Sequence, residues 1–197
     1  MEAAMRSEEE MMNLILQVAK DDERVRAVYL NGSRTNPNAP KDRFQDYDVV
    51  YVVTDTKPYY ENHDWINHFG TVLYMQMPEY MDLLLEKEYT PQDTFGWLAI
   101  FIDGNRLDIH VSSFDYADKD IRADRLCRVL LDKDGRYCDI PEETDADQDH
   151  PRLRGEYMKA FQSKVCFNVF LIPSIIHHLK KASEILRQDS TSLYDNL

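Results

Sequence analysis

The stretch DYDVVYVV, residues 46–53, is the clearest strand signal in the chain. Its apolar residues occupy both alternating positions, so we expect both faces of this strand to be buried, as in the centre of a sheet. Asp46 and Asp48 interrupt the apolar run, and they point to the same face because alternate residues of a strand do so. Buried carboxylates cost free energy unless they are paired or bind a metal. The stretch therefore predicts a central strand that begins at two functional acids.

The segments around this strand alternate between helical and extended patterns. Ser7 and Glu10 form a capping box, which predicts a helix from about Glu8 to Lys20. Val25–Leu30 is an apolar, β-branched run and predicts a strand. Further strands are predicted at 72–77, 95–102 and 106–112, the last two as a hairpin, and further helices at 65–69, from Pro78 onward and at 121–131. This alternation indicates the α/β (α+β) class.

The C-terminal third differs in composition from the rest of the chain. Residues 139–149, DIPEETDADQD, carry six acids and no base. Such a run is typical of a linker or an exposed loop. We therefore expect a first domain over residues 1–138, an acidic linker over 139–150 and a short helical C-terminal segment over 151–197, interrupted near Pro173.

Composition restricts the partners and the compartment. The formal net charge is −13, which disfavours binding to nucleic acid or to anionic membranes and suits a cationic partner. No apolar stretch is long enough to span a bilayer, and the acidic N-terminus does not resemble a signal peptide. Three cysteines without a zinc-binding spacing indicate free thiols. We expect a cytoplasmic protein.

Gly32, Ser33 and Arg34 directly follow the strand at 25–30 and are candidate nucleotide-binding residues. Glycine lets the backbone approach a phosphate closely. The Ser33 hydroxyl and amide are donors for a triphosphate, and Arg34 would add charge-assisted hydrogen bonds. The alternatives are that Ser33 only caps a helix and that Arg34 only forms a surface ion pair.

Asp46, Asp48 and Asp108 are candidate metal ligands. Two carboxylates on one strand face suit Mg²⁺, which prefers hard oxygen ligands. Asp108 lies on the polar side of the alternating strand 106–112, and it would bind a second metal or act as general base on an attacking hydroxyl. The alternatives are that these are surface acids of a sheet edge or of a hairpin. His110 shares a face with Asp108, and we expect it to be structural or peripheral.

The Gly-Ser turn, the Asp-x-Asp strand and the third Asp together resemble the nucleotidyltransferase superfamily, which has the polymerase-β-like fold. A closer resemblance is to the aminoglycoside 6-adenylyltransferases, and it extends over roughly residues 5–140. The segments that carry it are MRSEEEMMNLILQVAKDDERVR (5–26), GSR (32–34), PKDRFQDYDVVYVV (40–53), DWINHFG (64–70), MQMPEYMDL (75–83), RLDIHV (106–111) and LLDKDGR (130–136).

The resemblance implies a polymerase-β-like core, a mixed sheet flanked by helices, in the domain 1–138. It implies transfer of AMP from ATP to a hydroxyl of a streptomycin-like aminoglycoside, release of pyrophosphate and antibiotic resistance. Asp46 and Asp48 match the family's metal-binding pair, Gly32 and Ser33 its phosphate-binding turn, and Asp108 its third acid. Two Mg²⁺ ions are expected. Aminoglycosides are polycations, which agrees with the negative charge of the chain.

The resemblance also has a limit. Members of the family carry a long helical C-terminal domain that helps to enclose the aminoglycoside, whereas about fifty residues follow the acidic run here. A shortened or divergent homologue is therefore expected, in which a homodimer would supply the missing wall. Two other functions stay open. The acceptor is a protein or another small molecule, or the chain is a truncated homologue that binds nucleotide without transferring it.

Overall fold

A computed structural model describes residues 4–39, 45–80, 90–123 and 126–142. All of them belong to one unit, Met1–Ala146. The predicted helical segment at 151–197 and most of the predicted linker at 139–150 lie outside the described residues.

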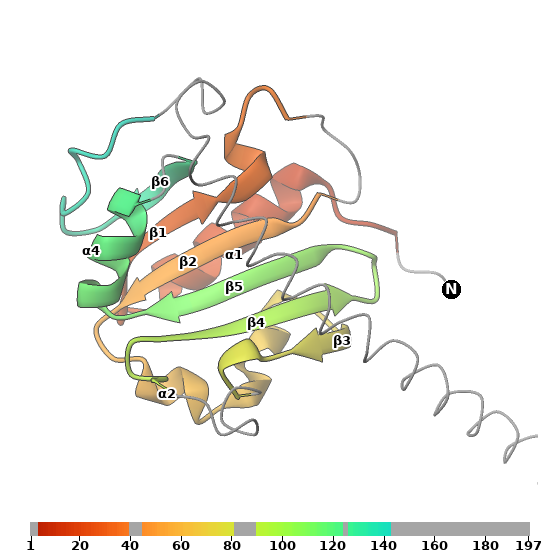
Figure 1. Cartoon of the computed structure of the whole chain (residues 1–197). Coiled ribbons are helices and arrows are strands. Elements are labelled where there is room, and N and C mark those ends of the chain that lie inside the picture. Colours follow the sequence, from red (N-terminus) through yellow and green to blue (C-terminus); the bar gives the residue numbers. More distant parts are fainter. Residues whose placement is uncertain (1–3, 40–44, 81–89, 124–125, 143–197) are drawn as a thin grey trace, which may run out of the picture. The chain divides into compact units, whose positions relative to one another are not determined.

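The described part is built on a six-stranded sheet with the strand order β3-β4-β5-β2-β1-β6 (Figure 1). β2 and β5 are parallel, and the other neighbouring pairs are antiparallel. The sheet is therefore mixed, as predicted. Its strands are β1 (Val25–Asn31), β2 (Tyr47–Val53), β3 (Val72–Gln76), β4 (Thr94–Phe101), β5 (Arg106–Ser112) and β6 (Cys127–Asp132).

The strand β2 lies inside the sheet, as its apolar run predicted. Every residue of β2 is buried except Asp48, which is partly buried. In the register of the sheet, Asn31 of β1 is opposite Asp48, and Asp48 is beside Asp108 of β5. The end of β1 and the beginnings of β2 and β5 therefore meet at one place in the sheet.

Helices cover the sheet because each face carries its own apolar cluster. On one face, α1 (Glu8–Asp21) and the 3₁₀ helix η2 (His63–Phe69) contribute to the larger core, with α2 (Lys57–Tyr60) beside them. Tyr51 of β2 links these elements: its hydroxyl donates to the carbonyl of Ile15 at 2.5 Å, and its ring meets Trp65 edge-on at 5.9 Å. On the opposite face, α4 (Phe114–Ala123) packs Ala117 and Ile121 against β1 and β2.

The predicted helix at 121–131 is wrong. Residues 127–132 form β6, which pairs with β1 as an antiparallel strand, and α4 ends at Ala123. The residues of this run fit a helical period, but they also alternate in the manner of a strand, and local periodicity alone does not separate the two for a short run. Pairing with the open edge of β1 decides the conformation.

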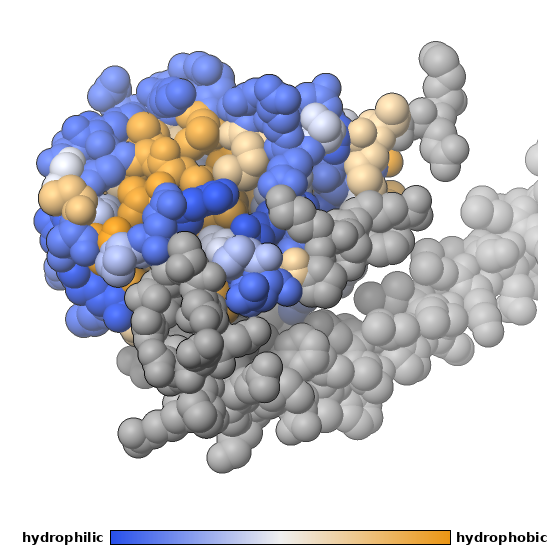
Figure 2. All heavy atoms as spheres, turned by 90° about the horizontal axis from the view of Figure 1, so that it is seen from above, coloured by the Kyte–Doolittle hydropathy of each residue, from blue (hydrophilic) through white to orange (hydrophobic). Residues whose placement is uncertain are grey.

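Several large apolar side chains are exposed to solvent on the surface of the described part. Seen from above, it shows an apolar patch framed by hydrophilic residues (Figure 2). The large apolar side chains that are most exposed are Leu73, Ile102, Tyr74, Met5, Tyr116 and Ile100. Among the described residues, no helix is long and apolar enough to cross a membrane.

The segment LLDKDGR has a structural role that its sequence did not reveal. The Lys133 ammonium donates to the carbonyls of Ala19, Lys20 and Asp22 at 3.0, 3.4 and 3.0 Å, so it caps the C-terminal end of α1 from the end of β6. A positive charge at this end also interacts favourably with the helix dipole. Lys133 thereby joins the first helix to the last strand of the described sheet.

Replacing Lys133 by methionine is expected to lower the free energy of unfolding by about 1–3 kcal/mol, because the hydrogen bonds of a charged donor are lost while the aliphatic stem is kept. Urea unfolding of Lys133→Met measures this. Lys20→Met is the matched control, since the side chain of Lys20 is exposed on the same last turn. Equal stability of the two variants would contradict the capping role.

Candidate metal and nucleotide site

The structure brings the three predicted acids together. One oxygen from each of Asp46, Asp48 and Asp108 lies within 4.8 Å of the others. The parallel pairing of β2 with β5 causes this, because it places Asp48 directly beside Asp108. Asp46 precedes Asp48 by two residues, at the approach to β2. β2 and β5 are interior strands of the sheet and Asp108 is buried, so Asp48 does not lie on an edge strand and Asp108 is not an exposed hairpin residue.

The three carboxylates repel one another in a site that is partly closed to water. Burial, and then the charges of Asp46 and Asp108, raise the pKa of Asp48 to about 7. Burial also raises the pKa of Asp108, and Arg106 opposes this rise. A cation placed among the three groups would remove the repulsion and favour the ionised forms.

Arg106 is a site residue that the sequence analysis missed. Its Nε and Nη2 donate to the two carboxylate oxygens of Asp108 at 2.9 and 2.6 Å, and its Nη1 lies 3.6 Å from Asp46 Oδ2. The signal was present, because Arg106 precedes Asp108 by two residues on an alternating strand and so shares its face. Arg106 supplies positive charge to the site but pairs with only two of the three acids.

Gly32 lies against Asp48. Its φ is +73°, a left-handed conformation that side chains disfavour, and a Cβ on it would lie 2.3 Å from Asp48 Oδ2. Glycine therefore lets the turn after β1 approach the carboxylates. The turn continues as the 3₁₀ helix η1 (Gly32–Thr35), and Ser33 Oγ accepts a hydrogen bond from Gln45 Nε2 at 3.1 Å. As a hydroxyl, Ser33 Oγ is a donor as well as an acceptor.

Arg34 fixes the chain that leads into β2. Its Nε donates to the carbonyl of Asp46 at 2.8 Å and its Nη2 to the carbonyl of Gln45 at 2.7 Å. Nη1 lies 3.4 Å from Glu8 Oε2, and the guanidinium lies 3.7 Å from the ring centroid of Tyr47. The structure thus shows Arg34 holding Asp46 in place through the backbone. Contact between Arg34 and a nucleotide stays a prediction.

The donor set fits a hard divalent cation such as Mg²⁺. Three carboxylates converge, and carboxylate oxygens are ligands that Mg²⁺ prefers. Asn31, which pairs with Asp48 in the sheet, has a buried side-chain oxygen without a hydrogen-bond partner in the described part of the chain. This oxygen would be available to accept a hydrogen bond from water bound to such a cation.

Known proteins share this part of the chain. A family model described as streptomycin adenylyltransferase matches residues 5–163. The aminoglycoside 6-adenylyltransferase of Bacillus subtilis (strain 168) is 46% identical over 133 residues, which cover 66% of this chain and 45% of that protein. The one of Campylobacter jejuni is 39% identical over 143 residues, which cover 73% of this chain and 48% of that protein.

A solved structure agrees with these matches. The crystal structure of an aminoglycoside 6-adenyltransferase from Bacillus subtilis superposes with a TM-score of 0.52 at 36% sequence identity, covering 67% of this chain and 43% of that one. The predicted fold is therefore confirmed for the core. The chain spans about half the length of the relatives that it matches.

The raised pKa of Asp48 predicts a pH-dependent cost to stability. The folded carboxyl keeps its proton up to about pH 7, whereas the unfolded one loses it near pH 4, so the folded state binds more protons between these values. Stability of the metal-free protein should therefore fall as the pH rises through this window. At pH 8, Asp48→Asn should raise the free energy of unfolding by about 2–4 kcal/mol, since one pKa unit corresponds to about 1.4 kcal/mol.

Urea unfolding in the presence of a chelator, at pH 5 and at pH 8, measures this difference. The gain from Asp48→Asn should shrink at pH 5. Added Mg²⁺ at pH 8 should stabilise the wild-type protein more than the variant, because the ion binds the folded site. A gain that is the same at both pH values would refute the repulsion.

The contacts of Arg34 predict an effect on metal binding without nucleotide. Arg34→Met keeps much of the apolar stem but releases the carbonyls of Gln45 and Asp46, so the affinity for Mn²⁺ should fall about tenfold, corresponding to about 1.4 kcal/mol of lost preorganisation. Electron paramagnetic resonance of free Mn²⁺ measures it. Unchanged Mn²⁺ affinity together with weaker ATP binding would show instead that Arg34 acts only on phosphate.

Proposed function

This chain belongs to the streptomycin adenylyltransferase family, and from that premise we propose that it transfers AMP from ATP to a hydroxyl group of an aminoglycoside such as streptomycin, releasing pyrophosphate. The observation that carries the proposal is the convergence of Asp46, Asp48 and Asp108 beside the turn at Gly32. Modification of the drug in this way would confer resistance to it.

Gly32 and Ser33 are the proposed binding residues for the triphosphate. The absence of a side chain at Gly32 lets the turn lie directly against the Asp48 carboxylate, and the hydroxyl of Ser33 is a donor suited to a phosphate oxygen. A phosphate over this turn lies next to the three carboxylates. Arg34 would keep the segment before β2 in position and lend positive charge to the same region.

Asp46, Asp48 and Asp108 are the proposed ligands of Mg²⁺, with two ions expected. When bound, the metal supplies charge neutralisation for the phosphates and for the attacking and leaving oxygens. The protein contributes the geometry, since the register of β2 and β5 and the contact of Arg34 hold the three carboxylates before any ligand arrives.

Asp108 is the proposed catalytic base. Burial raises its pKa, which makes its carboxylate a better proton acceptor than an exposed one. Arg106 holds both of its oxygens and so fixes the orientation of the group. Asp108 would take the proton of the substrate hydroxyl as that oxygen attacks the α-phosphorus in line with the departing pyrophosphate.

The proposed partners are ATP and a cationic aminoglycoside. The formal net charge of −13 favours a polycation, while the triphosphate depends on the local cations and the metal. A homodimer that completes the acceptor wall and a cytoplasmic location remain predictions. The other acceptors considered, a protein or a different small molecule, are separated from streptomycin by the following experiment.

Pyrophosphate release should require ATP, Mg²⁺ and streptomycin together, and Asp48→Asn should reduce its rate by two to three orders of magnitude, because a ligand of the metals that stabilise transition-state charge is removed. A coupled pyrophosphate assay measures the rate, and mass spectrometry identifies the product carrying AMP. Asp64→Asn is the control, since Asp64 is exposed on η2, away from the three acids.

Undiminished release by Asp48→Asn would refute the proposed role of the carboxylates. Absence of release from the wild-type protein, with ATP and Mg²⁺ still bound, would refute streptomycin as acceptor and favour another acceptor or a homologue that binds nucleotide without transferring it.

A further inference from the structure

The phosphate turn and the opposite side of the sheet divide the site into two halves. In the strand order, β1 lies on one side of the acid-bearing strands β2 and β5, and β4 and β3 lie on the other. Gly32 and Ser33 follow β1. In-line displacement places the attacking hydroxyl opposite the leaving pyrophosphate. With the phosphates over the turn, the acceptor therefore approaches over β5 and β4.

Glu79 lies on this acceptor side. It follows β3, and its Oε2 accepts a hydrogen bond from the amide of Gly96 in β4 at 2.9 Å. The pairing of β3 with β4 runs only as far as Gln76 and Leu98, so the carboxylate takes the place of a strand partner for that amide. Glu79 is thus held at the edge of β4 by the backbone and keeps one oxygen for other contacts.

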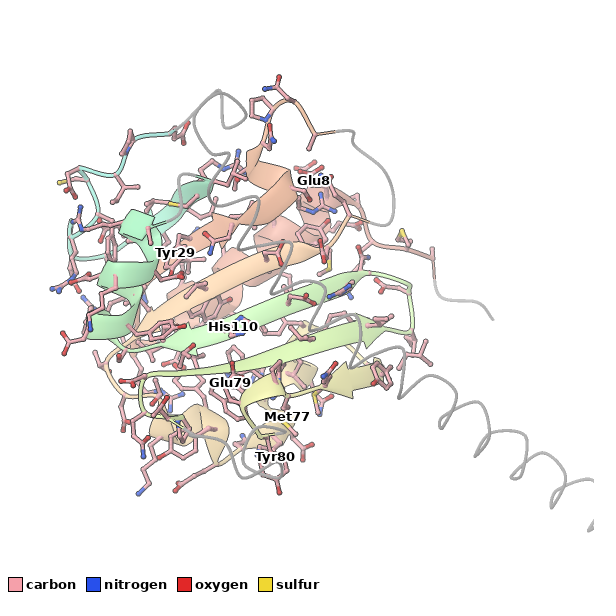
Figure 3. The ribbon with its side chains drawn as sticks, in the orientation of Figure 1. Glu8, Tyr29, Met77, Glu79, Tyr80 and His110 are labelled. Atoms are coloured by element: carbon pink, nitrogen blue, oxygen red, sulfur yellow. The ribbon has the colours of Figure 1, made fainter. Side chains whose placement is uncertain are left out.

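That second oxygen faces His110. Glu79 Oε1 lies 3.7 Å from His110 Nε2, and Figure 3 shows the two side chains near each other at β4 and β5. His110 lies over Gly96, where a Cβ would come within 2.3 Å of the ring. Since His110 follows Asp108 by two residues on β5, the two residues lie about 7 Å apart along the strand and share its face.

The ionic partner of Glu79 is His110. Within the described part of the chain, Glu79 forms no ion pair with a lysine or an arginine. Its side chain keeps 21% of its surface exposed, so a ligand can reach it. Other acids lie near Glu79. The pKa of Tyr116 is raised mainly by burial and in addition by the negative charges of Asp120, Glu79 and Asp93, so these three acids surround the same tyrosine. A cation entering this side would meet an accessible carboxylate whose ionic partner, among the described residues, is a histidine and not a lysine or arginine.

We propose that Glu79 binds a cationic group of the acceptor, a guanidinium or an ammonium, and so selects a polycationic substrate over neutral hydroxyl compounds; this inference rests on the function proposed above. The carboxylate is fixed by the Gly96 amide, which lowers the ordering cost of binding. A substrate cation anchored at Glu79 leaves a neighbouring hydroxyl within reach of Asp108.

The test is Glu79→Gln, which keeps an oxygen for the Gly96 amide and removes the charge. Titration calorimetry with streptomycin should show the dissociation constant rising about tenfold or more, the range of a lost charge-assisted hydrogen bond. KM for streptomycin should rise in the same proportion, while KM for ATP stays within about twofold. Glu61→Gln, at an exposed acid whose ion partner is Lys57, is the matched control.

The salt dependence of streptomycin binding is a second test of the proposed charge interaction. The affinity of the wild-type protein for streptomycin should fall with added salt, and Glu79→Gln should show a smaller salt dependence at an unchanged thermal midpoint. Equal affinity and equal salt dependence in the two proteins would overturn the inference while leaving the proposed transfer intact.

The failure of transfer is distinguishable from the failure of this inference. Streptomycin that binds the wild-type protein but is not adenylylated would refute the proposed function, and a loss of binding in Glu79→Gln would still support the cation site. Absence of streptomycin binding to the wild-type protein would overturn the inference itself.

Discussion

Repulsion among three carboxylates is the constraint on which the rest of the site depends. Parallel pairing of β2 with β5 forces Asp48 and Asp108 together, and burial withholds the water that would screen them. Arg106 relieves part of the repulsion through Asp108 and Asp46. The remaining part is an unfavourable energy in the free protein, and a cation placed among the carboxylates would remove it. A site of this kind sacrifices stability for affinity, as functional sites commonly do.

Features that depend on the residues of a single strand could be predicted from the sequence, whereas features that depend on distant segments could not. The apolar run at 46–53 defined β2, and the alternation at 106–112 placed Asp108 on its polar face, because both patterns are properties of single strands. The strand β6 was mistaken for a helix because its conformation depends on pairing with β1, over a hundred residues earlier in sequence at some positions. Glu79 escaped notice for the same reason, since its partner is a backbone amide in another strand.

The two halves of the site differ in how they are built. On the proposed nucleotide side, the main feature is a missing side chain, at Gly32, together with backbone contacts made by Arg34. On the proposed acceptor side, the Glu79 carboxylate and the His110 ring lie around a second glycine, Gly96. The family relationship concerns both halves, because the matched region includes them. If this assignment holds, differences in acceptor specificity should arise mainly from residues of the second half, where side chains rather than backbone would contact the substrate.

The cap that Lys133 places on α1 bears on how the chain folds as it is synthesised. The bond from Lys133 to the carbonyl of Ala19 closes a separation of 114 residues, and β6 completes its pairing with β1 over a similar span. Closing such long loops is slow and entropically costly. The first helix therefore emerges from the ribosome well before its final partner exists. Nearly the whole domain must be translated before its earliest element becomes locked, and that interval is when nascent-chain chaperones have the most to protect.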